Sequence, residues 1–406
     1  MSLNINADRL WQSIMSTAAI GGTPEGGVKR LALSEEDRHI RDWLRAECEK
    51  LGATVEVDEL GNIFAHYPGK NASAKPVAIG SHLDTQPTGG KFDGILGVLS
   101  GLEILRTLSE NEIVPDQPIV LVDWTNEEGA RFSPSMGSSA AYAGVSPAEE
   151  ILAARDRNGI TFGEALDGIG YCGSAPLGKI QFDSMFELHI EQGPVLEAEN
   201  IAIGVVTGAQ GMRWYDVHIR GMASHAGTTP MHLRQDAFMA AAEFALEMRR
   251  LALLEGANIT IGEFFIPNAS RNVIPGEVSF TVDIRHPDDL TLDNLERAIE
   301  KFASSDATTI SIDRLLKSAP VVFDPDCIEL VGAAVEQRGY SSQKILSGAG
   351  HDSVHVSKVA PTVMIFVPCK NGISHNPTES ITMQDAANGA QVLLDAVLMR
   401  ANSGAA

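Results

Sequence analysis

Four short apolar runs constrain the fold of this chain more than any other feature. They are "KPVAIGS", "PIVLVDW", "MFELHI" and "PTVMIFVP", at residues 75–81, 118–124, 185–190 and 361–368, and polar residues follow each of them. Continuous apolar runs of this length are typical of strands that are buried on both faces. Residues 94–110 lie between the first two runs and repeat apolar positions at helical spacing. We therefore predict an α/β fold with a mostly parallel sheet and helices on both faces.

Residues 211–322 follow a different pattern. We expect strands at 213–221, 257–266, 277–286 and 308–316, and helices at 234–255 and 291–305. The order β-α-β-β-α-β is that of the ferredoxin-like α+β unit. A chain of 406 residues also exceeds the roughly 250–300 residues at which a single core stops growing. We predict a discontinuous first domain formed by residues 1–210 and 323–406, interrupted by an inserted domain at 211–322.

The composition excludes several kinds of partner. A formal charge of −22 disfavours nucleic acid and anionic membrane surfaces, because both would repel the protein. The four cysteines form no CxxC pair, the opening residues do not resemble a secretion signal, and no apolar run reaches the ~18 residues of a membrane span. We expect a cytoplasmic protein with reduced thiols. An anionic substrate would have to be bound by particular arginines or by metal ions.

The segment "SHLDTQPTGGKFDG", residues 81–94, follows the first apolar run. Ligand sites in open parallel sheets form at the carboxyl ends of the strands. The glycines allow the loop to fold back, so that His82 and Asp93 can reach one point. Asp84 suits the carboxylate that accepts the second N–H of a metal-bound imidazole. Taken alone, the segment is a weak signal, and a hydrogen-bonded loop histidine explains it more simply.

Adjacent carboxylates, Glu127 and Glu128, follow the second run in "TNEEG". Desolvating two like charges side by side is costly unless a cation compensates them. Because neighbouring side chains point in different directions, one glutamate can bind a metal ion while the other faces the substrate as a base. A solvated pair of loop glutamates is the alternative interpretation.

Two further histidines, His189 and His375, belong to the third and fourth runs and their loops. With the preceding residues they complete the donor set for two divalent ions. We predict that Asp93 bridges the ions, that His82 binds the first and Glu128 the second, and that His189 and His375 supply the two remaining ligands. Two such ions activate a water, and Glu127 would accept its proton. This mixed ligation suits Zn, Mn, Co or Ni, without a choice among them.

Other catalytic signatures are missing or misplaced. "GIGYCG" at 168–173 fits the dinucleotide pattern GxGxxG, but it follows a helical stretch instead of a strand. The sequence contains no GxSxG elbow, Walker loop or HExxH motif. Cys369 stands beside the expected site, and we do not expect it to act as a nucleophile. The sequence therefore disfavours nucleotide-binding, serine hydrolase and zincin functions.

Six motifs in register carry a resemblance to a known group. They are "GSHLDTQPTGGKFDG", "TNEEGARF", "ELHIEQGPVLE", "RGMASHAGTTP", "FTVDIRHPD" and "SGAGHDS" with "GISHNPTE", and the match runs in order from about residue 30 to 390. Together they resemble the N-carbamoyl-L-amino acid hydrolases, β-ureidopropionases and allantoate amidohydrolases, within the superfamily of two-metal amidohydrolases and aminopeptidases. The resemblance implies that the inserted domain is a lid that forms a homodimer. It also implies a catalytic role for the predicted residues, with Glu127 as general base and as ligands His82, Asp93, Glu128, His189 and His375.

The resemblance also implies a set of substrate contacts. Asn272 and Arg285 would hold the substrate carboxylate, Gln192 would read the ureido group, and the backbone at Gly350 would approach the substrate. His225 would stabilise the oxyanion, from its own chain or from a partner subunit. From the residues alone, the Arg285 guanidinium is a fork suited to a carboxylate, and the alternative is an ion pair with Asp283.

We expect His351 and Asp352 to form a hydrogen-bonded pair in the wall of the site, with His351 as the alternative ligand if His375 faced away. The predicted reaction is hydrolysis of the ureido C–N bond of N-carbamoyl-L-amino acids, which releases ammonia, carbon dioxide and the amino acid. The alternatives are action on allantoate or N-carbamoyl-β-alanine, an aminoacylase or dipeptidase activity, and a metal-binding relative without catalysis.

Overall fold

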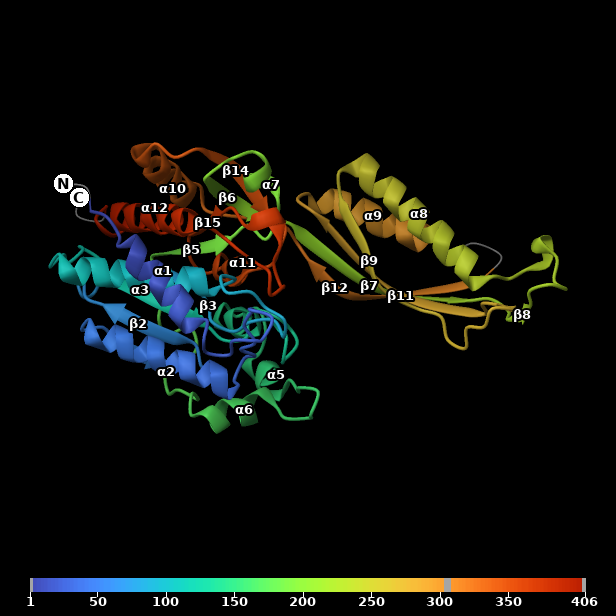
Figure 1. Ribbon diagram of the computed structural model, residues 1–406, viewed down its shortest axis with the longest axis horizontal. Helices are drawn as coiled ribbons and strands as arrows, with labels where there is room; N and C mark the ends of the chain where they lie inside the picture. Colours follow the sequence, from blue (N-terminus) through green and yellow to red (C-terminus); the bar gives the residue numbers. More distant parts are fainter. Residues whose placement is uncertain (1–2, 303–307, 404–406) are drawn as a thin grey trace. The chain divides into compact units, whose positions relative to one another are not determined.

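The computed structural model describes residues 3–302 and 308–403. The chain divides into two compact units (Figure 1). The first unit runs through Gly208 and resumes at Val322, and the second spans Ala209–Val321. These boundaries lie close to residues 211 and 322, where we placed the inserted domain.

The described part of the first unit is built on a nine-stranded sheet in the order β1-β2-β4-β3-β5-β15-β6-β13, with β14 paired to β6. The strands are β1 (Thr54–Val57), β2 (Ile63–Tyr67), β3 (Val77–His82), β4 (Ile119–Trp124), β5 (Ser184–Ile190), β6 (Ile203–Ala209), β13 (Val321–Val322), β14 (Ser342–Ser347) and β15 (Thr362–Val367). The four central strands, β4, β3, β5 and β15, are parallel, and β1, β2 and β6 pair antiparallel. The central strands are the four predicted apolar runs, and the α/β fold class is confirmed.

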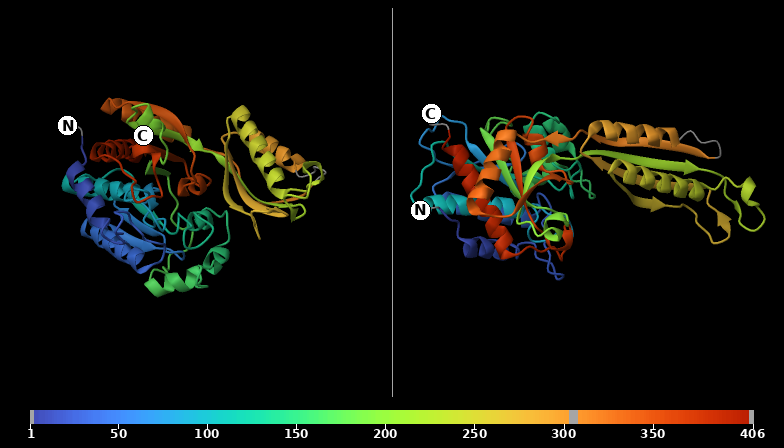
Figure 2. Two further views of the ribbon diagram at one scale, coloured as in Figure 1. Left: turned by 45° about the vertical axis from the view of Figure 1, so that its right-hand side comes forward. Right: turned by 90° about the horizontal axis from the view of Figure 1, so that it is seen from above.

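Helices cover both faces of this sheet (Figures 1 and 2). On one face α3 and α12 contact the strands, with α1, α2 and α10 packed around them, and on the other face lie α4 and α11. The long helices are α1 (Ala7–Thr17), α2 (Glu35–Lys50), α3 (Ile95–Glu110), α10 (Pro325–Arg338) and α12 (Met383–Ala401). The short ones are α4 (Gly137–Tyr142), α5 (Ala148–Ala153), α6 (Phe162–Ile169), α7 (Val195–Ala198), α11 (Asp352–Val356) and the 3₁₀ turn η2 (Lys370–Gly372).

The central strands are apolar throughout because each packs against helices on both sides. On β4, Leu121 belongs to the core under α3, whereas Val122 belongs to the core on the opposite face. Since the four strands are parallel, they end at one edge of the sheet. The loops that begin at residues 83, 125, 191 and 368 leave from this edge and carry the polar residues singled out in the sequence.

The second unit is the predicted ferredoxin-like fold. Its sheet order is β12-β7-β11-β9 with antiparallel pairing, and one face packs against α8 and α9. Its elements are β7 (Gly211–Arg220), β8 (Ser224–His225), η1 (Met231–Leu233), α8 (Ala237–Glu255), β9 (Asn258–Phe265), β10 (Val273–Ile274), β11 (Glu277–His286), α9 (Asp289–Phe302) and β12 (Thr309–Ser318). On β11, Val278, Phe280, Val282 and Ile284 face the helices and are buried.

Helix α8 begins three residues later than the apolar pattern suggests. The Asp236 side chain accepts hydrogen bonds from the backbone N–H groups of Phe238 and Met239, which makes Asp236 the N-cap. Helix α9 is described to Phe302, and its expected end at 303–305 lies outside the described residues. Within the described ranges, no helix is long and apolar enough to cross a membrane.

Candidate metal centre

Asp93 lies at the centre of two groups of potential metal ligands. Its Oδ1 is 3.3 Å from His189 Nε2 and 3.5 Å from His82 Nε2, and its Oδ2 is 3.6 Å from His375 Nε2. Glu128 Oε2 lies 3.4 Å from the same His375 nitrogen. The first triad is therefore His82, Asp93 and His189, and the second is Asp93, Glu128 and His375. The structure thus pairs His189 with His82 and His375 with Glu128, which the sequence had left open.

The edge of the sheet positions these side chains. His82 ends β3, His189 lies near the end of β5, and Asp93 precedes α3. Gly94 follows Asp93 with a φ of +68°, and a Cβ there would lie 2.4 Å from His82 Nε2. Only glycine fits this position, because the imidazole lies directly against the backbone.

The orientation of both buried imidazoles suits metal binding. His82 Nδ1 lies 2.9 Å from the backbone oxygen of Asp84, and His189 Nδ1 lies 2.9 Å from that of Ile190. Each Nδ1 thus donates to a backbone oxygen, which leaves Nε2 as the nitrogen on the side of Asp93, where a bound ion would take its lone pair. His82 Nε2 is buried and has no hydrogen-bond partner within the described part of the chain. An unsatisfied, buried nitrogen that faces carboxylates is a ready ligand for a cation.

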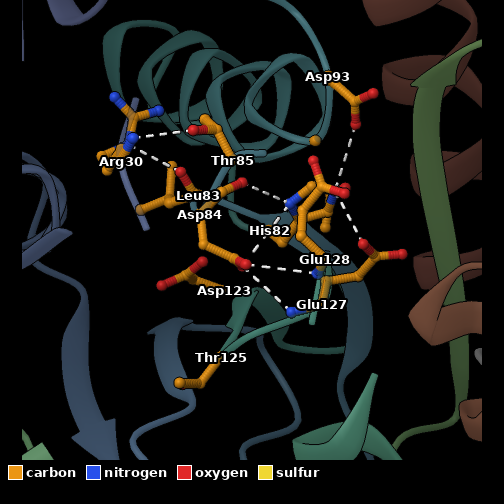
Figure 3. Close-up of polar contacts among 12 residues, drawn as sticks. Arg30, His82, Leu83, Asp84, Thr85, Asp93, Asp123, Thr125, Glu127 and Glu128 are labelled. Carbon is orange, nitrogen blue, oxygen red and sulfur yellow. Dashed lines mark hydrogen bonds and ion pairs between the residues drawn. The ribbon is translucent and has the colours of Figure 1, made fainter. Parts of the chain in front are cut away.

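Asp84 supports the site in a different way from the one expected. The His82 ring bonds to the backbone oxygen of Asp84, and the Asp84 carboxylate is more distant, at 3.8 Å from Nδ1. That carboxylate instead lies 3.1 Å from the backbone nitrogen of Glu127 and 3.3 Å from that of Glu128 (Figure 3). The turn after β3 places the carbonyl nearer to the ring, which leaves the side chain to fix the neighbouring loop.

Glu127 and Glu128 point to different partners, as two consecutive residues should. Glu127 Oε2 lies 3.6 Å from His82 Nε2, beside the first triad. Glu128 accepts hydrogen bonds from the backbone and side-chain nitrogens of Gln86, at 3.1 and 2.7 Å. Burial raises the pKa of Glu127 well above its ordinary value, His82 opposes this, and Asp352 and Glu128 reinforce it. Burial and Asp93 raise the pKa of Glu128 to about 8.

The electrostatics of the cluster fit a site for cations. Burial favours the neutral form of Asp93, but the His189 and His82 rings outweigh it and hold the pKa of Asp93 well below its usual range. The pKa of His82 is raised in turn, because Glu127 and Asp93 outweigh its burial. Very few positive charges therefore neutralise several buried carboxylates, and divalent cations would supply the missing positive charge. Imidazole and carboxylate donors in these two triads suit Zn, Mn, Co or Ni.

His351 lies against the site but belongs to neither triad that shares Asp93. It falls within a third group with Glu187 and His189. However, Glu187 accepts hydrogen bonds from Ser81 at 2.8 Å and from Ser353 at 2.5 Å, so hydroxyl groups already satisfy it.

The expectation that His351 and Asp352 are hydrogen-bonded to each other is wrong. His351 Nε2 lies 3.1 Å from Ser347 Oγ, and its Nδ1 faces Glu127 at 4.0 Å. His351 has extended backbone, whereas Asp352 is the first residue of α11, so the two side chains diverge. Gly350, in the loop directly before His351, remains a candidate for backbone contact with a substrate.

Gln192 lies beside the second triad. Its Nε2 is 2.7 Å from Asp93 Oδ2 and 3.4 Å from His375 Nε2. Both Gln192 and His375 have a φ of 55°, an uncommon backbone conformation for residues with a Cβ.

Cys369 is buried nearby, and burial raises the pKa of its thiol to about 12. A neutral thiol is a poor nucleophile, in agreement with the expectation.

Ser374 and Glu379 also lie at the site, and their roles were not predicted, although both belong to "GISHNPTES". Their hydrogen bonds reach Asp93 and the residue before it. The motif was interpreted only through its histidine. The only available signal was that the motif also contains a hydroxyl group and a carboxylate within five residues of His375.

The expected substrate-binding residues of the second unit lie in two places. His225 on β8 pairs with Val273 on β10, and the backbone nitrogen of Ala226 lies 3.0 Å from the oxygen of Asn272. His225 and Asn272 therefore lie together, beyond the Glu277 end of β11. Arg285 lies at the other end of that strand. There Nη2 of Arg285 is 2.8 Å from Asp283 Oδ2, so the structure shows the ion pair that the sequence had left as the alternative.

Comparisons with known proteins identify the family of this chain. The sequence profile of peptidase family M20/M25/M40 matches residues 78–399. The chain belongs to this family. The matched range contains both triads and Glu127. The family is metal-dependent, in keeping with the donor groups present here.

Similar proteins extend over the full length of the chain. An N-carbamoyl-L-amino-acid amidohydrolase of Rhizobium meliloti is 47% identical, covering 97% of this chain and 96% of its own. A second enzyme of that name, from Geobacillus stearothermophilus, is 38% identical and covers 97% and 98%. A crystal structure of a hydantoinase/carbamoylase family amidase from Burkholderia multivorans has a TM-score of 0.95 at 46% identity, covering 99% and 100%. The resemblance drawn from the motifs is confirmed.

Proposed function

We propose that this protein hydrolyses the ureido C–N bond of N-carbamoyl-L-amino acids and releases ammonia, carbon dioxide and the free amino acid. The observation that carries the proposal is the pair of ligand triads that share Asp93, with Glu127 beside them. The full-length similarity to two N-carbamoyl-L-amino-acid amidohydrolases supports this substrate class. The four cysteines are free thiols, which is consistent with a cytoplasmic location.

The residues around the triads have distinct tasks. Two divalent ions bound there would lower the pKa of a water and polarise the ureido carbonyl. Glu127 faces the first triad, so it would take the proton of the attacking water and deliver it to the leaving nitrogen. Asp84 holds the backbone of Glu127 and Glu128 in place. Gln192 lies against the second triad, where its amide can read the ureido group.

Arg285 would bind the substrate carboxylate through its two-pronged guanidinium. In this structure the guanidinium is engaged by Asp283, so substrate binding has to exchange one carboxylate partner for another. Asp283 keeps Arg285 on the open face of the sheet, since both project away from the buried core positions of β11.

His225 and Asn272 would reach the same substrate from a second copy of the chain. They lie beyond Glu277, eight residues along β11 from Arg285. At about 3.4 Å per residue, this stretch of strand spans roughly 27 Å, far more than a small ureido acid. One chain cannot present both groups to one substrate, whereas two chains in a dimer can.

The second unit offers a surface for such a dimer. β9 is an edge strand of its sheet, and Phe264 and Phe265 on it are exposed. Beside it, α8 exposes Leu246, Leu253 and Leu254, each by more than three-fifths of its surface. An apolar edge strand beside an apolar helix face is a surface that a second copy can cover. We propose a homodimer formed through β9 and α8.

The decisive experiment measures ammonia release by chelator-stripped protein, with and without added Mn, Zn, Co or Ni. The substrates are N-carbamoyl-L-amino acids, N-carbamoyl-β-alanine and allantoate, with an N-acetyl amino acid as control. We expect metal-dependent release, fastest from N-carbamoyl-L-amino acids. Faster release from another ureido acid would correct the substrate. No release from any of them by protein that has bound metal would overturn the proposal.

A further inference from the structure

The segment 374–379 does more than supply His375. The structure brings two other side chains of this segment, Ser374 and Glu379, onto the loop that carries Asp93. Glu379 is buried, at 4% exposure, and lies four residues beyond His375. A buried carboxylate outside the ligand triads requires an explanation.

The Glu379 carboxylate caps the turn that ends at Asp93. Its Oε1 lies 2.9 Å from the backbone nitrogen of Phe92 and 3.1 Å from that of Asp93. One oxygen thus satisfies two consecutive N–H groups in a loop that has no strand or helix to satisfy them. The two bonds fix the direction in which the Asp93 side chain leaves the backbone.

The loop is shaped to receive this carboxylate. A Cβ at Gly90 would lie 2.2 Å from the carboxylate carbon and from Oε1 of Glu379. Any side chain at residue 90 would therefore displace Glu379. The glycine in "PTGGKFDG" and the glutamate in "HNPTE" are two sides of one contact between segments almost 290 residues apart.

Ser374 orients the carboxylate itself. Its Oγ lies 2.6 Å from Asp93 Oδ2 and 3.2 Å from Glu379 Oε2. A hydroxyl group has one proton, and the shorter distance assigns it to Asp93. Since Oδ2 is the oxygen that faces His375, the other oxygen is left directed at His82 and His189.

We infer that Glu379 and Ser374 are positioning residues that hold Asp93 in the orientation in which one oxygen serves each ligand triad. Glu379 sets the position of the whole residue, and Ser374, together with Gln192 on the same oxygen, sets the rotation of its carboxylate. The inference rests on the metal centre of the proposed function. It predicts that loss of Glu379 lowers the affinity for both ions. Loss of Ser374 should lower mainly the affinity for the ion of the second triad.

The test is a calorimetric titration of Mn²⁺ into chelator-stripped protein, which measures the two binding steps without using activity. Glu379→Ala should lower the affinity of both steps by about 10–100-fold, the usual effect of losing a partner of a metal ligand. Glu379→Gln keeps an oxygen for the two N–H groups and should lose less than about tenfold, the lower end of that range. Ser374→Ala should weaken one step more than the other.

Thr378→Val is the matched control, since Thr378 lies in the same turn but bonds to Asn376. It should bind both ions as the wild type does. Circular dichroism and the melting temperature of the metal-free variants establish that they are folded. If Glu379→Ala does not fold, Ser374→Ala and Glu379→Gln decide.

Unchanged affinity for both ions in folded Glu379→Ala, or in Ser374→Ala, would overturn the inference. So would a Glu379→Gln variant that binds as weakly as the alanine variant, because the hydrogen-bonding oxygen would then not be the cause. These results leave the metal centre standing. A wild-type protein that binds fewer than two ions would overturn the centre itself, and the inference with it.

Discussion

The metal centre of the first unit and the substrate-facing residues of the second unit are prepared for their tasks to different degrees. His82, Asp93 and His189 are at most 5% exposed, and their polar atoms already face one another. By contrast, His225 is exposed on a two-stranded ribbon, and Arg285 is engaged by Asp283. The first ligand triad is therefore held by the core, whereas the substrate-facing groups of the second unit lie on a surface.

This difference separates reaction from specificity. Ligand triads need geometry held to a fraction of an ångström, and only a packed sheet edge with supporting hydrogen bonds gives that. Substrate recognition has to admit and release a small acid, so exposed side chains that change partners are better suited to it. The comparison predicts that substitutions in the two regions change different measurable quantities.

The largest effect is expected from Glu127→Gln. The amide cannot accept the proton of the attacking water, and turnover should fall by about 10²–10⁴-fold. The ion content should not change, because Glu127 belongs to neither triad. Ammonia release together with metal analysis of the same sample measures both quantities. If the turnover of Glu127→Gln stayed within tenfold of the wild type, Glu127 would not be the general base.

Arg285→Ala should act on recognition instead. Losing a hydrogen bond to a charged group costs about 1.5–3 kcal/mol, so kcat/KM for N-carbamoyl-L-amino acids should fall by roughly 10–100-fold. Both metal-binding steps should stay as in the wild type. Arg285→Lys should recover only part of the loss, because an ammonium group lacks the two-pronged geometry. An equal loss on a ureido compound without a carboxylate would contradict this role.

Mixing two strongly impaired variants tests whether the site is shared between chains. His225→Ala and Arg285→Ala proteins that exchange subunits form heterodimers with one complete site. A 1:1 mixture should then recover about a quarter of the wild-type activity, since half of the dimers carry one intact site. If exchange is demonstrated and no activity returns, His225 does not act from the partner.

The dimer surface is open to a smaller perturbation. Leu253→Asp on α8 places a charge on a residue that is 77% exposed in the single chain and covered in the proposed dimer. We expect at least tenfold weaker dimerisation in sedimentation experiments, from the loss of apolar burial. Leu290→Asp on α9, exposed by 64%, is the matched control and should leave the dimer intact. Similar effects of both would argue against α8 as the interface.

The smallest effect is expected on stability, from the buried carboxyl group of Asp123. Burial raises the pKa of Asp123 from 3.8 to about 7, and Arg41 opposes the shift. When a carboxyl group has a higher pKa in the folded than in the unfolded state, the folded protein loses stability as the pH rises from about 4 through 7. In metal-free protein, Asp123→Asn should therefore gain in melting temperature relative to the wild type between pH 5 and 8. A constant difference across that range would contradict the shift.

Much of the fold could be predicted, because local patterns decide it. Strands buried on both faces need continuous apolar runs, so β3, β4, β5 and β15 could be found from the sequence. The ferredoxin-like unit followed from its order of strands and helices. The start of α8 was misplaced because the side-chain cap at Asp236 overrides the apolar pattern.

The sequence by itself determined which residues are candidate metal ligands and which edge of the sheet they share, since strand ends and residue types are local properties. Tertiary structure alone decided that His189 joins His82, that the Asp84 backbone holds the His82 ring, and that Ser374 and Glu379 hold Asp93. It also separated Arg285 from His225. These outcomes depend on the directions of side chains from segments far apart in the chain, and residue spacing does not specify direction.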